Sequence, residues 1–95
     1  MKITNINGTS DTMCSCGSWL QHWANFSGRQ IPTYCPVSLC MNKDLVGAHV
    51  QKVSVYDNKW YICPLCNEHN RSKATLEIPD GFTLVSANKK ETCGK

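Results

Sequence analysis

Cysteine and histidine side chains recur in the middle of the chain at spacings that suit a tetrahedral metal ion. Cys35 and Cys40 enclose four residues in the segment CPVSLC, and Cys66 and His69 stand three residues apart in CPLCNEH. Zinc takes four such ligands, and pairs this close reach one ion because the loop between them folds around it. The spacing therefore predicts a structural zinc site formed by Cys35, Cys40, Cys66 and His69.

Cys63 is an alternative fourth ligand, because it lies three residues before Cys66 and can reach the ion from the turn that enters a helix. Cys66 and His69 would share one face of that helix, which favours His69 over Cys63. Flanked by apolar residues, Cys63 is otherwise a small core residue. Cys63 and Cys66 also form a CxxC dithiol motif, but they lack the preceding strand and helix of a thioredoxin-like redox protein.

The other three cysteines and a histidine leave room for a second metal site. Such a site would combine Cys14, Cys16, His22 and Cys93 and would tie the two ends of the chain together. The Cys14–Cys16 pair is more closely spaced than the pairs in common zinc loops, and His22 can equally form a hydrogen bond within a helix. Both interpretations stay open at the level of the sequence.

The size and composition of the chain favour a metal-stabilised domain. At 95 residues it forms one small domain, residues 1–95, whose core leaves little margin of stability. The N-terminal segment lacks the apolar run of a signal peptide, and no stretch approaches a membrane span, so we expect a cytoplasmic protein. In a reducing compartment, close-set cysteines bind metal rather than form disulfides. The net charge of +3 permits contact with nucleic acid but does not require it.

Two elements are expected before the first cysteine pair. Residues 1–13 are rich in polar side chains and predict a flexible N-terminal arm. Ser18 can cap a helix in which Trp19, Leu20, Trp23 and Phe26 recur at helical spacing, and Gly28 suits its end. This Trp-rich helix should dock on the core.

The remaining elements must bring the two ligand pairs together. Residues 45–56 and 59–63 predict a β-hairpin, with a bulge near Gln51 where the apolar alternation changes phase. Pro64 then predicts the first turn of a short helix, and residues 76–78 and 82–86 predict a C-terminal hairpin. The expected fold is therefore a small α+β domain in which a cysteine loop, a hairpin and a short helix surround zinc.

The order of these elements over residues 35–73 resembles the HNH endonuclease family and its treble-clef, or ββα-metal, relatives. The resemblance rests on Cys35 and Cys40, on VGAHV with His49, and on YICPLCNEHNRSK. It implies a treble-clef fold, with His49 as general base and Asn70 as ligand of a second, catalytic divalent cation. Ala48 stands where a nuclease of this family would offer a metal-ligating side chain, so the resemblance extends to the zinc scaffold more fully than to the catalytic site.

The function expected from these features is that of a small zinc-binding module without catalytic activity. Such a module would bind nucleic acid or a protein partner through the hairpin, the helix and exposed aromatic residues such as Trp60 and Tyr61. A modulator of a larger machine, encoded by a phage or mobile element, would fit this description. Basic side chains in this half of the chain offer phosphate contacts: Lys52, Lys59, Arg71 and Lys73. The alternative is a metal-dependent HNH-type DNA endonuclease with His49 as general base.

Overall fold

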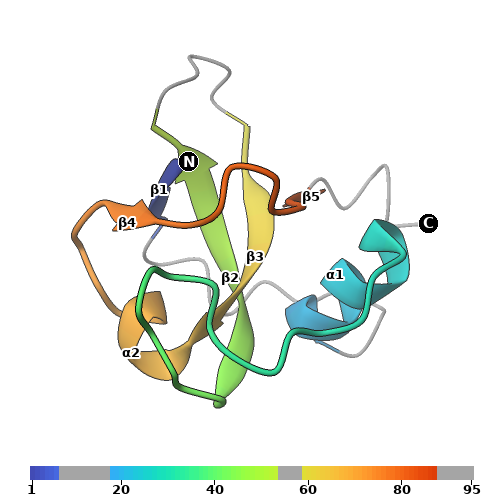
Figure 1. Cartoon of the computed structure of the whole chain (residues 1–95). Helices are drawn as coiled ribbons and strands as arrows, with labels where there is room; N and C mark the ends of the chain where they lie inside the picture. Colours follow the sequence, from blue (N-terminus) through green and yellow to red (C-terminus); the bar gives the residue numbers. More distant parts are fainter. Residues whose placement is uncertain (7–17, 54–58, 88–95) are drawn as a thin grey trace.

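A five-stranded antiparallel sheet forms the centre of the protein in the computed structural model, which describes residues 1–6, 18–53 and 59–87 (Figure 1). The strands are β1 (Lys2–Asn5), β2 (Leu45–Lys52), β3 (Tyr61–Cys66), β4 (Leu76–Glu77) and β5 (Val85–Ser86), and their order across the sheet is β4-β1-β2-β3-β5. Two helices accompany them, α1 (Trp19–Ser27) and the single turn α2 (Asn67–Asn70). This is the small α+β fold expected from the sequence.

Strand β1 corrects the prediction of a loose N-terminal arm. Residues 2–5 pair with β2 on one side and β4 on the other, and Ile3 is fully buried between them. The α-amino group of Met1 lies 2.7 Å from Glu77 Oε2 and donates to the carbonyl oxygen of Ile78. Pairing on both edges outweighs the polar composition that predicted an arm, while residues 7–13 lie outside the described part of the chain.

The central hairpin β2–β3 is present, but its details differ from the prediction in two ways. The pairing of β1 with β2 continues in register across Gln51, which faces Thr4, so the chain has no bulge at this described position. Strand β3 continues through Pro64 to Cys66, and α2 begins at Asn67 rather than near Pro64. Pairing of Pro64 with Gly47 of β2 therefore outweighs the local preference of proline for a helix start.

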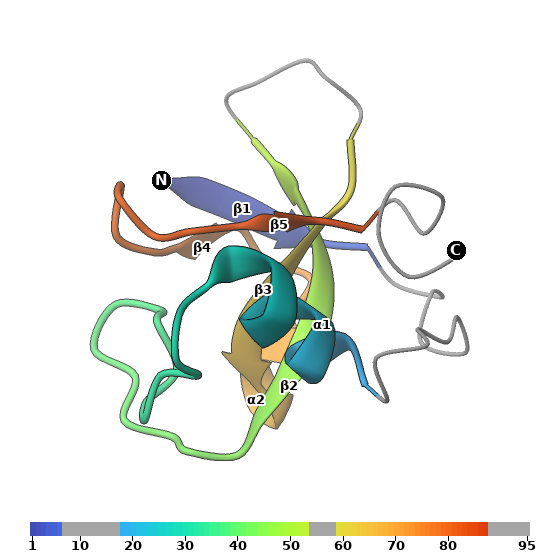
Figure 2. The ribbon, with the colours of Figure 1, turned by 90° about the vertical axis from the view of Figure 1, so that its right-hand side faces the viewer.

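Helix α1 covers one face of β2 and β3, as Figure 2 shows. The prediction of this helix is confirmed: the Ser18 hydroxyl accepts a hydrogen bond from the backbone N–H of Gln21, and Gly28 ends the helix with a left-handed φ of 69°. Trp19 and Trp23 pack against the sheet together with Ile62 and Val85. None of the described helices is long and apolar enough to cross a membrane.

Strands β4 and β5 do not form the predicted C-terminal hairpin. They lie at opposite edges of the sheet, and the segment between them crosses its face (Figure 1). On the way, Ile78 is buried and Phe82 packs against both apolar clusters of the core. A tight turn would leave these side chains at the rim, so their burial favours the crossing over the hairpin.

Candidate metal centre

The first ligand pair lies in the knuckle loop, which we define as residues 35–40. The backbone N–H of Cys35 donates to the Asn42 carbonyl at 2.8 Å, and that of Cys40 donates to the Val37 carbonyl at 2.9 Å. Ser38 N–H donates to the carbonyl of Glu77 in β4 at 3.0 Å. These bonds close the loop and attach it to the edge of the sheet.

The second ligand pair stands where β3 ends and α2 begins. Cys66 is the last residue of β3 and also the N-cap of α2, and its Sγ lies 3.4 Å from the backbone nitrogen of His69. The single turn of α2 then returns the His69 ring to the same sulfur, at 3.2 Å from Nδ1. The short helix therefore positions both ligands of this pair.

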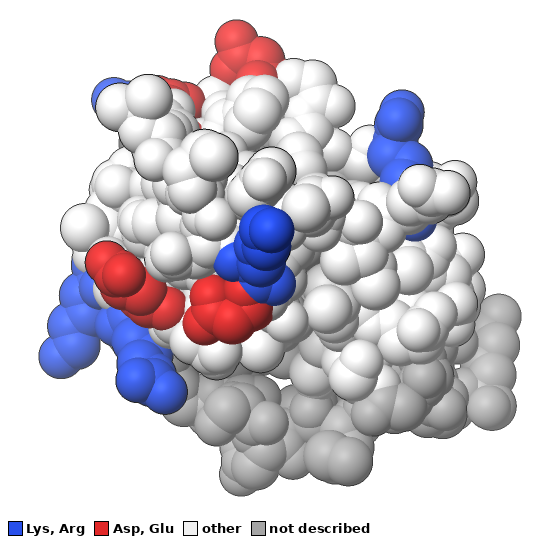
Figure 3. All heavy atoms as spheres, turned by 60° about the horizontal axis from the view of Figure 1, so that its bottom comes forward, with Lys and Arg blue, Asp and Glu red and all other residues white. Residues whose placement is uncertain are grey.

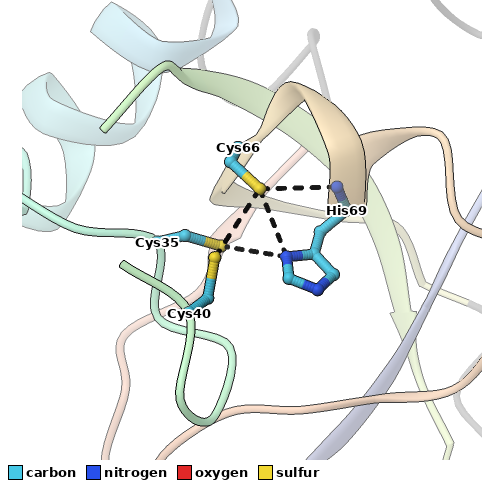
Figure 4. Close-up of side chains that lie close together, drawn as sticks. All are labelled: Cys35, Cys40, Cys66 and His69. Atoms are coloured by element: carbon cyan, nitrogen blue, oxygen red, sulfur yellow. Dashed lines mark hydrogen bonds between the residues drawn. The ribbon is translucent and has the colours of Figure 1, made fainter. Parts of the chain in front are cut away.

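The four side chains converge on one point between the knuckle loop and α2 (Figure 4). Their ligand atoms all lie within 4.8 Å of one another, with Cys40 Sγ and Cys66 Sγ 3.9 Å apart and Cys35 Sγ 3.6 Å from His69 Nδ1. In a regular zinc tetrahedron, bond lengths of about 2.3 Å to sulfur and about 2.0 Å to nitrogen place two sulfurs about 3.8 Å apart and sulfur and nitrogen about 3.5 Å apart. The set of Cys35, Cys40, Cys66 and His69 can therefore hold a metal ion, and its donors suit zinc.

The surroundings of the two buried thiols differ. Burial raises the pKa of Cys35 to about 11. Burial also acts to raise the pKa of Cys66, but hydrogen bonds from Asn42 and from the backbone N–H of His69 outweigh it and lower the pKa to about 7. A divalent cation would stabilise both thiolates directly, because thiols that bind a metal are deprotonated.

Two asparagines support the ligands, and the sequence analysis did not identify either of them. Asn42 Nδ2 donates to Cys66 Sγ at 3.4 Å. Asn5 Nδ2 of β1 donates to the carbonyl oxygens of His69 at 2.6 Å and Ser72 at 3.1 Å, which fixes the end of α2. The position of Asn42 just after the knuckle loop could have suggested its role, whereas nothing in the sequence near Asn5 indicates contact with residues more than sixty positions away.

Cys63 lies apart from the four converging ligands. It is fully buried opposite Ala48 in the apolar core, and its Sγ donates to the Pro64 carbonyl oxygen at 3.6 Å. Burial raises the pKa of the Cys63 thiol far above its ordinary value. Cys63 is thus placed as a small core residue, and it and Cys66 do not form the exposed dithiol of a redox motif.

His49 occupies an aromatic environment on the α1 side of β2. Its ring centroid lies 4.6 Å from that of Trp19 and 6.4 Å from that of Trp60, and only 7% of the residue is exposed. Burial, and secondarily the proximity of His22, lowers the pKa of His49. Asn70, the other residue assigned to a nuclease site by the family resemblance, ends α2 and is half-buried.

Of the four residues of the predicted second metal site, the structure describes one. His22 is buried, and its Nε2 lies 2.9 Å from the carbonyl oxygen of Ser86. A carbonyl oxygen only accepts, so this nitrogen carries the proton and is engaged as a donor. The cysteines that would complete a second site lie outside the described residues: Cys14, Cys16 and Cys93.

Comparison of the chain with protein-family models, with curated proteins and with solved structures finds no match.

Proposed function

We propose that this protein is a small non-catalytic module that a structural zinc ion stabilises and that recognises a protein partner. The convergence of four ligand atoms within 4.8 Å carries the zinc part of the proposal. Cys35 and Cys66 belong to the main apolar cluster, so an ion at this point would join the knuckle loop to the core. A small domain gains most from such a link.

The arrangement of the ligands supports a treble clef as the finer description of the fold. The knuckle loop contributes the first pair, β2 and β3 form the hairpin that follows it, and α2 supplies the second pair at its start. The three parts come in this order along the chain and meet at one point. Strand β1 extends the sheet beyond β2, and helix α1 covers one face of the hairpin.

The outer surface beside the metal centre supports recognition of a protein. Leu39 is fully exposed, Met41 is 70% exposed and Tyr34 is 41% exposed, so several large apolar side chains lie on or near the knuckle loop. Figure 3 shows this end of the molecule: basic side chains in the foreground stand beside acidic ones, and much of the remaining described surface is uncharged. Such a surface suits an apolar recess on a protein better than it suits a row of phosphates.

The backbone at Leu39 strengthens this interpretation. Among the described residues other than glycine, Leu39 is the one with a left-handed backbone, at a φ of 66°. Glycine would adopt this conformation at lower energy, and a fully exposed leucine gains nothing from packing within the chain. A contact with a partner would give the leucine side chain a function at this position.

Native mass spectrometry of the purified protein tests the zinc site. We expect that Cys66→Ser reduces the zinc content by one ion per chain, whereas Cys63→Ala leaves it unchanged because Cys63 lies in the core. The comparison holds even if the chain binds a second zinc ion, because it uses only the difference in zinc content between each variant and the unaltered chain. Equal zinc content in all three proteins, or none in any, would refute the proposed site.

Leu39→Asn tests the recognition surface, because asparagine tolerates a left-handed backbone while removing the apolar side chain. We expect a protein that binds the unaltered chain to bind Leu39→Asn at least about tenfold more weakly, as for a central interface residue. Lys73→Gln, an exposed change outside the knuckle loop, should leave binding intact. Salt-dependent binding of DNA or RNA fragments that is insensitive to Leu39→Asn would favour a nucleic-acid partner instead.

The environment of His49 supports the non-catalytic part of the proposal. A general base must reach a water molecule beside the scissile phosphate, whereas His49 is buried between aromatic rings. Incubation of the zinc-loaded protein with plasmid DNA and magnesium or manganese should leave the plasmid intact. Cleavage that His49→Ala abolishes would overturn this conclusion.

A further inference from the structure

A groove with a volume of about 500 Å³ lies between the end of α1 and the segment that precedes β5. Its walls come from Trp23, from residues 28–30 and from residues 81–83, with Pro32 at one end. None of the four predicted zinc ligands lines it, so it is distinct from the metal centre. Its size is that of a site for a small organic group.

The aromatic wall of the groove is formed by the half-buried Phe82 ring, which rests on the buried Trp23 ring. Trp23 and Phe82 stack with their centroids 5.8 Å apart and their planes 18° apart. The indole N–H of Trp23 already donates to the Thr83 carbonyl at 2.8 Å. Gly28 and Gly81 leave open space, since nothing lies within 4 Å of a Cβ built on either. A flat apolar group can therefore lie beside the Phe82 ring, and the Trp23 N–H keeps its hydrogen bond.

Arg29 supplies the polar group of the groove. Its Nε donates to Thr83 Oγ1 at 3.0 Å, and its backbone N–H donates to Ser27 Oγ at 3.1 Å. Among the described residues, the ion pairs are those of the Met1 ammonium, and none involves Arg29. The anchored Nε leaves the terminal guanidinium nitrogens available, and these bind carboxylates through paired hydrogen bonds.

The end of α1 weakens the attraction of the groove for anions. Helix α1 ends at Ser27 with no basic residue in its last turn, so its C-terminal end carries a partial negative charge of about half an electron. Arg29 offsets this charge and keeps a net attraction for one negative charge. A small anion without an apolar part, such as inorganic phosphate, therefore gains little here, because it buries nothing against Phe82.

We propose that this groove binds a carboxylate carried on a flat apolar group, with Arg29 holding the carboxylate and Phe82, which rests on the buried Trp23 ring, contacting the apolar part. Two sources share this chemistry: a free aromatic acid, and the C-terminal residue of a peptide that ends in an aromatic side chain. The site does not depend on the zinc ion or on the apolar surface of the knuckle loop, so its test is independent of the proposed function.

Titration of the zinc-loaded protein, followed by ¹H–¹⁵N NMR, tests the proposal with a matched pair of ligands. N-acetylphenylalanine and its amide differ only in the carboxylate. We expect the acid to shift the signals of residues 23, 28–30 and 81–83 with a dissociation constant on the order of a millimolar, as for a ligand of this size. The amide should bind about tenfold more weakly, and inorganic phosphate should leave these signals in place.

Variants assign the carboxylate contact to Arg29. Arg29→Gln should weaken binding of the acid about tenfold without changing the melting temperature, because the residue is exposed. Lys43→Gln removes a cation that lies over the Tyr34 ring instead, and should leave binding unchanged. Tighter binding of a tripeptide that ends in phenylalanine than of the free acid would identify a peptide as the source, and equal binding would identify a free acid. Equal affinities for acid and amide, or no shifts in these residues at 20 mM ligand, a concentration of about twenty times the expected dissociation constant, would overturn the proposal.

Discussion

Replacement of Gly47 by alanine is expected to separate α1 from the sheet. A Cβ at this position would meet the backbone nitrogen of Leu20 and the carbonyl carbon of Trp19 well inside 3.0 Å, a separation that real Cβ atoms essentially always keep. These are backbone atoms of the first turn of α1, so no side chain can rotate away to relieve the contact. Ordinary van der Waals contact with a Cβ begins at about 3.4 Å, so α1 must move away from β2 by about 1 Å.

The expected cost follows from this displacement. Overpacking of a well-packed core costs about 1–3 kcal/mol, and a clash with backbone lies toward the upper end of that range. Alanine recovers about 0.5 kcal/mol relative to glycine in a strand. The net loss of about 2 kcal/mol corresponds to a fall in melting temperature on the order of 10 °C for a domain of this size.

Thermal unfolding of the zinc-loaded protein, followed by circular dichroism, measures this loss, and two other glycines provide controls. Gly81→Ala should leave the melting temperature unchanged, because nothing lies within 4 Å of its added Cβ. Gly28→Ala meets no atoms either but must hold a φ of 69°, which should cost about 1 kcal/mol. A melting temperature for Gly47→Ala equal to that of Gly81→Ala would refute the close approach of α1 to β2.

Three further measurements examine the metal centre, the buried histidine and the knuckle loop. Asn42→Ala removes the hydrogen bond to Cys66 Sγ and should lower the zinc affinity about tenfold in a chelator competition; an unchanged affinity would show that this bond plays no part in metal binding. Because the pKa of His49 is lowered in the folded state, the unfolded chain binds more protons below a pH of about 6.5, and stability should fall as pH decreases through that value. His49→Gln should reduce this fall between pH 7.5 and 5.5 in urea unfolding, and identical pH profiles would contradict the shift. Leu39→Gly should change the melting temperature little, because relief of the left-handed backbone offsets the entropy gained by the unfolded chain. Leu39→Val should lower the melting temperature by several degrees, because a β-branched side chain tolerates this backbone less well. The reverse order would argue against backbone strain at this residue.

Local patterns predicted the parts of this structure that depend on neighbouring residues. Ser18 and Gly28 marked the two ends of α1, and the spacing of Cys66 and His69 is enough to place both side chains at one turn of helix. These features follow from contacts over three or four positions, which the sequence displays directly. The convergence of this pair with the knuckle loop required only that a hairpin lie between them.

The features that the sequence did not reveal depend on pairing between distant segments. Residues 2–5 carry no alternating pattern strong enough to predict a strand, yet their backbone fits between β2 and β4 because both neighbours offer unpaired edges. Once β1 occupies that place, β4 is held at its outer edge, and the segment that follows must cross the sheet to reach β3. The position of one polar N-terminal strand therefore excludes the C-terminal hairpin.

The same strand links the fold to the metal centre. Asn5, at the end of β1, donates to the carbonyl oxygens of His69 and Ser72, and the knuckle loop is hydrogen-bonded through Ser38 to β4, the other neighbour of β1. Both ligand pairs are thus held by segments that β1 positions. A zinc ion in turn would oppose separation of these segments, because moving either one would stretch the coordination tetrahedron. We infer that the edge formed by β1 and β4 unfolds together with the metal site rather than before it.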